Sequence, residues 1–462
     1  MSISELDMFS EFSIKGSWWL PNNPGDQVSG TLHFSNENIK LRLDRSFLIP
    51  ELVSAYSVGS FKAPVVLGHT NDRNRCTILR AFYLSSHGNE VVLAANALLV
   101  GVHLIDESNL PIHEALLRFI HLEDWTGQPL VRDMEGSTPD HFTFVVPTAA
   151  KPVFRVEGPP QFKRLVLWNG IQISRTRTQT SLTSQNHFQL DFDPPANLPT
   201  VNQMIRGLAN VLSLLVGETA LPRKIRLITH ETGTDEARTV DYFVPSRTIP
   251  PKAQSEFDMP FPLRDFGDGD SAGNLFKEWF LKEGILRPVC DLLLSTIYNP
   301  SQYVQSTFLS LAQALESFHR RTRDGIYVPK EDYAKIREAL ALVIPAGTTP
   351  EFKEKLLSAL AFGNELSLRT RIRQLFEGID SQHAIDLTGY PKLQDFIALF
   401  TGVRNYLTHY DERHRPAIID NIVDMYNLNR RLRAILTLML FKYLGMNEDR
   451  LFLPLKSHLS LF

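Results

Sequence analysis

Residues 391–411 read PKLQDFIALFTGVRNYLTHYD, and the apolar positions in this stretch recur with the spacing of an α-helix. One stripe of the predicted helix contains Leu393, Phe396, Ile397, Phe400, Val403 and Leu407. Pro391 suits the first turn of such a helix, and Pro416 lies beyond its end. Arg404 falls inside the apolar stripe, where an unpaired guanidinium would cost several kcal/mol. The sequence therefore predicts either a carboxylate partner for Arg404 or a groove or subunit contact at this part of the helix.

Two polar residues, Asn405 and His409, are four positions apart and emerge together on the polar side of this helix. Arg404 and His409 are separated by about 140° around an ideal helix. If both groups act on one phosphate, either the helix loosens near its end or the two groups come from different subunits. The spacing alone is a weak signal, because an arginine at a helix end is more often a salt-bridge partner than a catalyst.

A second predicted helix, residues 303–321, supplies a candidate partner for Arg404. Its apolar stripe contains Val304, Phe308, Leu311, Ala312, Leu315 and Phe318. Glu316 and His319 lie at or inside the edge of that stripe, so Glu316 is placed to pair with Arg404. The alternative is a solvated glutamate beside a core histidine.

Four arginine clusters occur in the second half of the chain, at residues 319–323, 369–373, 413–415 and 430–433. Such clusters are usually solvated faces, but four of them in one near-neutral bundle can also hold a phosphate backbone. The candidate RNA-binding residues are Arg320, Arg321, Arg413 and Arg415.

The chain divides into parts with different local patterns. Residues 1–245 contain short β-branched and aromatic runs with one amphipathic helix at 201–216, which predicts an antiparallel β-sandwich or jelly-roll-like domain with an added helix. Residues 246–273 are rich in proline and glycine and are interpreted as a linker. Residues 274–446 show helical periodicity and predict an all-α bundle, and 447–462 follow as a C-terminal tail. We therefore expect an α+β chain of two domains.

Composition excludes several classes of protein. The 462 residues carry 48 Lys+Arg and 51 Asp+Glu, and 43% are hydrophobic, which argues against a disordered chain and a globally basic nucleic-acid coat. A small basic excess lies in residues 271–462, whereas the preceding part is acidic. Cys76 and Cys290 form no CxxC pair, and no apolar run reaches the ~20 residues needed to cross a bilayer. We expect a cytoplasmic protein without a membrane span. The scattered histidines predict no metal site, and we expect no cofactor.

Three segments resemble one known family. Arg404-Asn-Tyr-Leu-Thr-His409 resembles the R-x(4–6)-H motif of HEPN ribonucleases. Residues 308–320, FLSLAQALESFHR, resemble the xLxLxxALExxHR segment of the ApeA-like HEPN subgroup. Near the other end, IKGSWWLP at 14–21 and VSGTLHF at 28–34 are similar to the start of the N-terminal domain that accompanies this HEPN domain. These segments occur in the right order in both halves, and the part between them is similar only in general character.

This resemblance implies a metal-independent endoribonuclease of anti-phage defence, an abortive-infection effector that cuts RNA through attack by a 2′-OH in a cleft shared by two subunits. Arg404, oriented by Glu316, would stabilise the phosphorane. His409 would act as acid or base, and Asn405 would position water, ribose or His409. The implied partners are RNA, with transfer RNA as one candidate, a second copy of the chain, and a phage-derived trigger at the N-terminal domain. The alternative is a non-catalytic protein whose β domain binds a ligand and whose helical bundle only dimerises.

Overall fold

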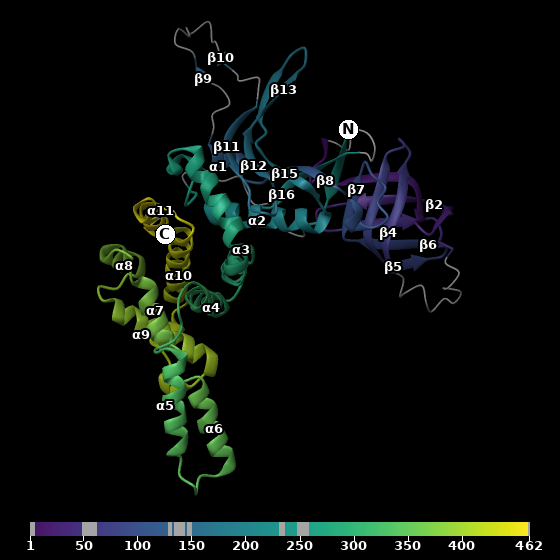
Figure 1. Cartoon of the computed structure of the whole chain (residues 1–462). Helices are drawn as coiled ribbons and strands as arrows, with labels where there is room; N and C mark the ends of the chain where they lie inside the picture. The colour runs from purple at the N-terminus through teal and green to yellow at the C-terminus, as the bar shows by residue number, and fades with distance from the viewer. Residues whose placement is uncertain are drawn as a thin grey trace. The chain divides into compact units, whose positions relative to one another are not determined.

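The computed structural model describes residues 5–48, 62–127, 132–133, 144–145, 150–230, 236–246 and 258–460 of the chain. The chain forms two compact units, Met1–Leu281 and Lys282–Phe462, and the boundary between them falls within helix α3 (Gly269–Tyr298). Strands dominate the first unit and helices make up the second (Figure 1). The predicted α+β class, with a β-rich part followed by an all-α part, is therefore confirmed.

The first unit begins with a closed antiparallel barrel. Its strands are β1 (Phe12–Leu20), β2 (Asn23–Phe34), β3 (Ile39–Leu43), β4 (Lys62–Thr70), β5 (Arg75–His87) and β6 (Glu90–Ala95). The ring closes because β6 pairs with β3 on one side and with β5 on the other. Alternation along β3 buries Ile39, Leu41 and Leu43, each at most 1% exposed. Closure pairs both edges of the ring, so this part is a barrel and not the pair of stacked sheets that a sandwich requires.

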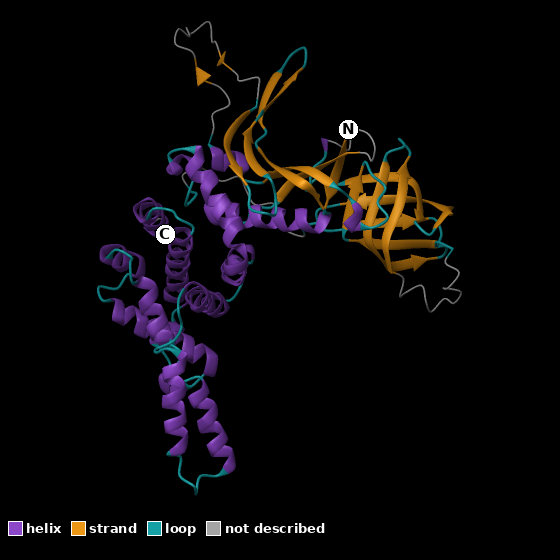
Figure 2. Cartoon of the chain, viewed as in Figure 1, coloured by secondary structure: helices purple, strands orange, loops and turns teal. Residues whose placement is uncertain are grey.

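An open antiparallel sheet continues from the barrel, because β5 also pairs with β7 (Ala97–Val100). Beyond β7 the strand order is β17 (Ala237–Phe243), β16 (Pro222–His230), β8 (Ile112–Phe119), β15 (His187–Ala196), β12 (Arg164–Asn169) and β11 (Lys151–Glu157). Helix α2 (Leu198–Val216) packs against β8 and is the amphipathic helix predicted among the strands (Figure 2). Alternation along β8 buries Leu117 and Phe119 on one face and places Leu116 and Arg118 on the other.

Smaller elements complete the described part of this unit. They are η3 (Glu107–Asn109), α1 (Leu122–Thr126), the hairpin β13 (Ile171–Arg175) and β14 (Thr180–Ser184), and the short pair β9 (Arg132–Asp133) and β10 (Phe144–Val145). The β13–β14 hairpin follows β12 and precedes β15 in the chain, so it is an excursion from the open sheet. Ser184, at one end of the hairpin, lines the same cavity as residues on the polar face of that sheet.

The proline- and glycine-rich segment 246–273 is described at residue 246 and from residue 258 onward. Its second part holds η4 (Leu263–Phe266) and the start of α3, and Phe261 is 1% exposed. The indole Nε1 of Trp125 donates a hydrogen bond to the Phe261 carbonyl at 2.9 Å. The stretch 258–273 therefore contributes buried residues to the first unit, and the linker interpretation stays a prediction for 247–257, which lie outside the described residues.

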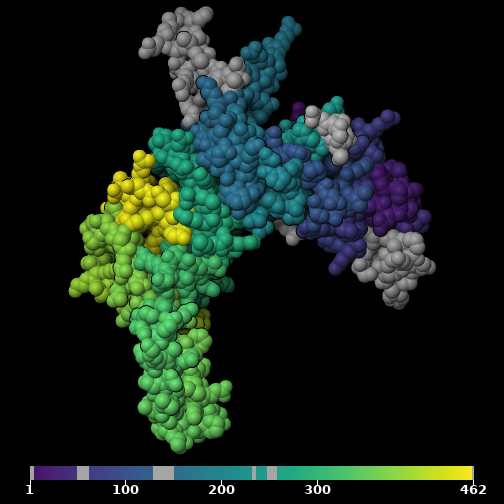
Figure 3. Space-filling model, in the orientation of Figure 1, coloured from purple at the N-terminus to yellow at the C-terminus, as the bar shows by residue number. Residues whose placement is uncertain are grey.

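The second unit contains the end of α3 and a set of packed helices. They are α4 (Val304–Thr322), α5 (Lys330–Leu342), α6 (Pro350–Ala361), α7 (Leu368–Phe376), α8 (Ser381–Thr388), α9 (Leu393–His409), α10 (Ile422–Tyr443) and α11 (Glu448–Ser460), with short turns η5 (Glu412–His414) and η6 (Ala417–Asp420). Helix α4 packs against α7, α9 and α10, and α10 packs against α8 and α11. The predicted helical bundle is confirmed. The α5–α6 hairpin has no buried residue and extends from the other helices of this unit (Figure 3).

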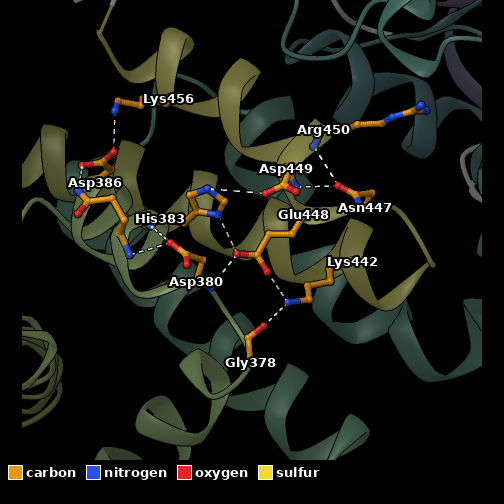
Figure 4. Close-up of polar contacts among 11 residues, drawn as sticks. Gly378, Asp380, His383, Asp386, Lys442, Asn447, Glu448, Asp449, Arg450 and Lys456 are labelled. Carbon is orange, nitrogen blue, oxygen red and sulfur yellow. Dashed lines mark hydrogen bonds and ion pairs between the residues drawn. The ribbon is translucent and has the colours of Figure 1, made fainter.

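Helix α11 occupies the stretch that we expected to be a C-terminal tail, and a polar cluster anchors it (Figure 4). The Glu448 carboxylate accepts a hydrogen bond from the Asp380 backbone N–H at 2.8 Å and lies 2.9 Å from His383 Nδ1. Lys442 pairs with the same carboxylate. Burial raises the pKa of Glu448, but the hydrogen bonds from Lys442, Asp380 and His383 outweigh burial, so its pKa lies below the ordinary value. These contacts fix the start of α11 against α8 and α10.

Candidate functional site

Helix α9 carries the motif, and its apolar stripe fixes it in the bundle. The buried members of that stripe are Phe396, Ile397, Phe400, Val403 and Leu407, each at most 4% exposed, and Leu393 is half-buried. The Phe400 ring lies 5.7 Å from that of Phe308 on α4, measured between ring centroids. The Phe396 ring lies 5.9 Å from that of Phe376 on α7. The predicted helix and its apolar stripe are therefore confirmed, and α9 is held between α4 and α7.

Arg404 lies at the margin of this stripe, with 35% of its side chain exposed. Its Nη2 is 4.0 Å from Oε2 of Glu316 on α4, and its Nη1 donates to Oδ1 of Asn405 at 3.4 Å. The aliphatic stem thus begins on the apolar face while the guanidinium reaches a carboxylate at the edge. The structure places three of the four residues that we proposed as catalytic near one another, and Glu316 is a carboxylate within ion-pair distance of the partly exposed Arg404.

His409 is the last residue of α9, and its side chain is exposed. Within the part of the chain that the structure describes, no hydrogen bond or ion pair holds its imidazole. The helix stays regular through His409 and ends at Tyr410, which adopts a left-handed conformation (φ 51°) and donates its N–H to the Tyr406 carbonyl at 2.6 Å. The helix does not loosen between Arg404 and His409, so within one subunit these two side chains leave α9 on different sides.

Glu316 belongs to a longer chain of alternating charges. Arg320 Nε donates to Glu316 Oε1 at 3.1 Å, and Arg320 Nη1 donates to Glu365 Oε2 at 2.9 Å. Glu365 Oε2 also lies 3.6 Å from Arg371 Nη2. Burial lowers the pKa of Arg320, but its two carboxylate partners outweigh burial, and the net shift is upward. Arg404 is therefore one end of a run of charges that passes along α4 and reaches α7.

Arg371 is a buried polar residue in this region, and the sequence pattern did not predict its burial. We interpreted its cluster as a solvated face or a phosphate-binding surface, yet Arg371 is 1% exposed, whereas Arg369 and Arg373 are exposed. Burial lowers the pKa of Arg371. This arginine is part of the core. Only one side of α7 faces solvent, so Arg369 and Arg373 are exposed while Arg371 is buried.

The Arg371 guanidinium joins α7 to the end of α4. Its Nε donates to the Leu366 carbonyl at 2.9 Å, its Nη2 donates to the Gly325 carbonyl at 3.3 Å, and its Nη1 lies 3.2 Å from His319 Nδ1. His319 is 0% exposed, and its Nε2 lies 2.7 Å from Gln374 Oε1. Burial lowers the pKa of His319. His319 is therefore the core histidine of our alternative interpretation, and it supports the bundle beneath Glu316.

Two of the proposed RNA-binding arginines follow α9 directly. Arg413 pairs with both carboxylate oxygens of Asp411, at 2.9 and 2.8 Å. Arg415 Nη1 donates to Glu412 Oε2 at 3.2 Å, and Arg415 Nη2 donates to Asp420 Oδ1 at 2.5 Å. The Arg413 side chain is 84% exposed, so its pairing is weak and open to competition.

The other two proposed RNA-binding arginines lie at the end of α4. Arg320 belongs to the charge chain described above, between Glu316 and Glu365. Arg321 Nη1 donates to the Ile285 carbonyl at 3.2 Å. All four of these arginines thus contact acceptors of their own chain, and their role in RNA binding stays a prediction.

Comparison with known families identifies both units. The model of the ApeA N-terminal domain 1 matches residues 13–279, more than half of the chain, and the model of the Apea-like HEPN domain matches residues 309–450. The second match includes α9 and the part of α4 that holds Glu316. Searches of curated proteins and of solved structures gave no match. None of the helices in the described ranges combines the length and apolar character that a membrane span requires. The chain belongs to the family of ApeA-like HEPN proteins, a HEPN-type family of anti-phage effectors.

Proposed function

We propose that this chain is a metal-independent endoribonuclease of anti-phage defence, and that Arg404 of one subunit and His409 of a second subunit act on the same RNA phosphate. The observation that carries this proposal is the arrangement on α9. Arg404 is held beside Glu316, whereas His409 is exposed and has no partner in the described structure. An exposed, unpartnered imidazole can transfer a proton, and a guanidinium can stabilise the negative charge that develops on a phosphate, so the two groups together supply the chemistry of acid–base RNA cleavage.

The chemistry follows from these side chains. A 2′-OH attacks the neighbouring phosphorus, a phosphorane with added negative charge forms, and the 5′-oxygen leaves, which yields a 2′,3′-cyclic phosphate and a 5′-OH. His409 transfers a proton in this sequence, because an imidazole can both donate and accept a proton. Arg404 presents a planar, permanently charged fork to the phosphorane oxygens, and Glu316 keeps that fork oriented. Asn405, exposed beside His409, positions the ribose or a water molecule.

A second copy of the chain completes the site in this proposal. The regular helix separates Arg404 from His409 within one subunit, so one phosphate reaches both groups only when they come from two subunits. Exposed apolar side chains that follow the motif in the chain support such a contact, since Tyr410 is 64% exposed and Ile422 and Val423 at the start of α10 are 68% and 64% exposed. Single exposed apolar residues are common, but neighbouring ones at the end of a helix favour a protein partner.

RNA cleavage by purified protein, with the new ends mapped, tests the proposal. The substrates are transfer RNA and an unstructured RNA, and the reaction contains a metal chelator. We expect cleavage by the wild type, loss of cleavage in His409→Ala and in Arg404→Ala, and wild-type cleavage in His414→Ala, which removes an exposed histidine just beyond α9. Full cleavage by either of the first two variants, or cleavage that needs a metal, would contradict the proposal.

A mixture of the two inactive variants tests the shared site. In a dimer of one Arg404→Ala subunit and one His409→Ala subunit, one site lacks both groups and the other keeps both. Free exchange of subunits should therefore restore about one quarter of wild-type activity. Light scattering should show the same dimer in each pure variant. No recovery in a mixture that has exchanged subunits would mean that both groups come from one chain, and a folded dimer that never cleaves RNA would favour the binding-only alternative.

A further inference from the structure

The first unit contains a polar cavity of about 910 Å³ that the proposed cleavage does not use. Its floor is the polar face of the open sheet, formed by β8 and β16, and its walls include the β13–β14 hairpin and the residues around Asp7. The lining combines arginine and lysine side chains with carboxylates, amides and hydroxyls. This volume is within the range of small-molecule sites, but the lining is too polar for an apolar ligand.

Positive charge is concentrated on the floor of this cavity. Lys224 on β16 is the direct cross-strand partner of Arg118 on β8, and Arg226 lies two residues further along the same face of β16. Like charges directly opposite each other destabilise a sheet, and an anion bound between them relieves that repulsion. Burial lowers the pKa of Lys224, and Arg226 and Arg118 lower it further, while Asp241 and Asp7 offset part of this shift. The floor is therefore suited to a phosphate.

Arg118 and Arg226 on the floor each keep a carboxylate partner, and Arg118 has a further donor. Arg118 Nη2 donates to Glu123 Oε1 at 3.0 Å, and Arg226 Nε donates to Asp241 Oδ1 at 3.1 Å. The Nε of Arg118 is buried and has no hydrogen-bond partner among the described residues. A guanidinium has five N–H donors in a fixed fork, so Arg118 can bind a second acceptor without releasing Glu123.

His121 supplies an independent sign of a ligand. Its side chain, which lines the cavity, is only 2% exposed, and its Nε2 has no partner among the described residues. Its Nδ1 lies 3.5 Å from Asp124 Oδ2, which favours a proton on Nδ1 and leaves Nε2 as an acceptor in the neutral ring. An unsatisfied buried nitrogen is costly, and a ligand hydroxyl would satisfy it.

We propose that this cavity binds a small phosphorylated sugar, with its phosphate against Arg118, Lys224 and Arg226 and its hydroxyls against His121 and Asp124. Cations alone would suit any anion, but carboxylates and an acceptor imidazole next to them would repel a simple anion and accept hydrogen bonds from sugar hydroxyls. Nucleoside phosphates and free sugar phosphates share this chemistry. The proposal does not depend on the cleavage activity of the second unit.

Calorimetric titration of the full-length protein tests this site with four probes: AMP, ribose 5-phosphate, adenosine and inorganic phosphate. We expect AMP or ribose 5-phosphate to bind. Lys224→Gln removes one charged donor, and His121→Asn removes Nε2 while keeping a residue that tolerates the left-handed backbone at this position (φ 64°). Each variant should weaken binding by about tenfold or more. Lys40→Gln, an exposed lysine on barrel strand β3, should leave binding unchanged.

The outcomes separate the two sources of the ligand. Binding of AMP but not of ribose 5-phosphate assigns a nucleoside phosphate, and similar binding of both assigns the sugar phosphate itself. The proposal would be overturned if inorganic phosphate or adenosine bound as tightly as AMP or ribose 5-phosphate. It would also be overturned if none of the four probes bound to the folded wild type. Wild-type affinity in Lys224→Gln would also overturn it, and this variant keeps the test valid if His121→Asn fails to fold.

Discussion

The buried guanidinium of Arg371 leads to a quantitative prediction for the variant Arg371→Met. Methionine keeps most of the buried volume but removes the donors that reach the Leu366 and Gly325 carbonyls. Two effects then oppose each other. Removal of a buried charge recovers its desolvation cost, and apolar replacement of complete buried ion pairs is often neutral or stabilising. Here two of the partners are backbone carbonyls and a third is Nδ1 of the buried His319, and all three stay in place, so the substitution leaves them without the guanidinium.

The geometry of each lost hydrogen bond decides the size of the effect. A buried acceptor that loses its donor costs about 1–3 kcal/mol. Leu366 is 6% exposed and its bond is 2.9 Å long, so the upper part of this range applies to its carbonyl. Gly325 is half-buried and its bond is 3.3 Å long, so water can replace the donor there at a smaller cost. After part of the sum is offset by recovered desolvation, we expect Arg371→Met to lower the free energy of unfolding by about 2–3 kcal/mol.

Urea unfolding followed by far-ultraviolet circular dichroism measures this loss, and hydrogen exchange in α4 and α7 localises it. The matched control is Arg369→Met, because Arg369 is exposed on the same helix. We expect the control to stay within about 0.5 kcal/mol of the wild type. An Arg371→Met protein as stable as the wild type, or more stable, would refute the reasoning and show that desolvation of the guanidinium outweighs its hydrogen bonds.

Two further predictions concern carboxylates. Glu316→Gln should change the free energy of unfolding by less than about 1 kcal/mol, because the pairs with Arg320 and Arg404 are partly exposed. If Glu316 orients Arg404, the same variant should lower RNA cleavage by about tenfold or more, and unchanged cleavage rates would remove Glu316 from the site. The pKa of Glu448 is lowered by folding, so its carboxylate stabilises the fold above about pH 4.3 and this stabilisation disappears as the pH falls through the folded-state pKa. Urea midpoints of wild type and Glu448→Gln should therefore differ at neutral pH and converge in acid, and a gap that does not change with pH would contradict this role.

Strand and helix patterns predicted the fold class but not the barrel. The alternation at Ile39–Leu43 is visible in the sequence, because a half-buried strand exposes every second residue whichever strands lie beside it. Closure depends on β6, which pairs with β3 and with β5. The pairing with β3 joins residues about fifty positions apart, and alternation records which face a residue lies on, not which strand is its partner. The β-rich class was therefore predictable, whereas closure required the pairings themselves.

The candidate site was predictable where one helix constrained another. Arg404 stood on an apolar stripe and so required a partner, and Glu316 lay at the edge of a neighbouring stripe. Arg371 was missed because a run of arginines resembles a solvated face. Its helical phase was the available signal, since it stands beside Ile372 and four positions before Leu375, both of which are buried.

The pairing of the surface arginines affects how RNA would bind under the proposed function. Arg413 and Arg415 already contact carboxylates of their own segment, so a phosphate must compete with Asp411 and Asp420 for them. Each such exchange adds less affinity than binding to an unpaired arginine, because part of the positive charge is already neutralised. If the proposed function holds, a single subunit should therefore attract RNA only weakly through these two arginines. Contacts in the proposed cleft between two subunits would then supply affinity as well as alignment, and we expect substrate binding, like cleavage, to depend on the dimer.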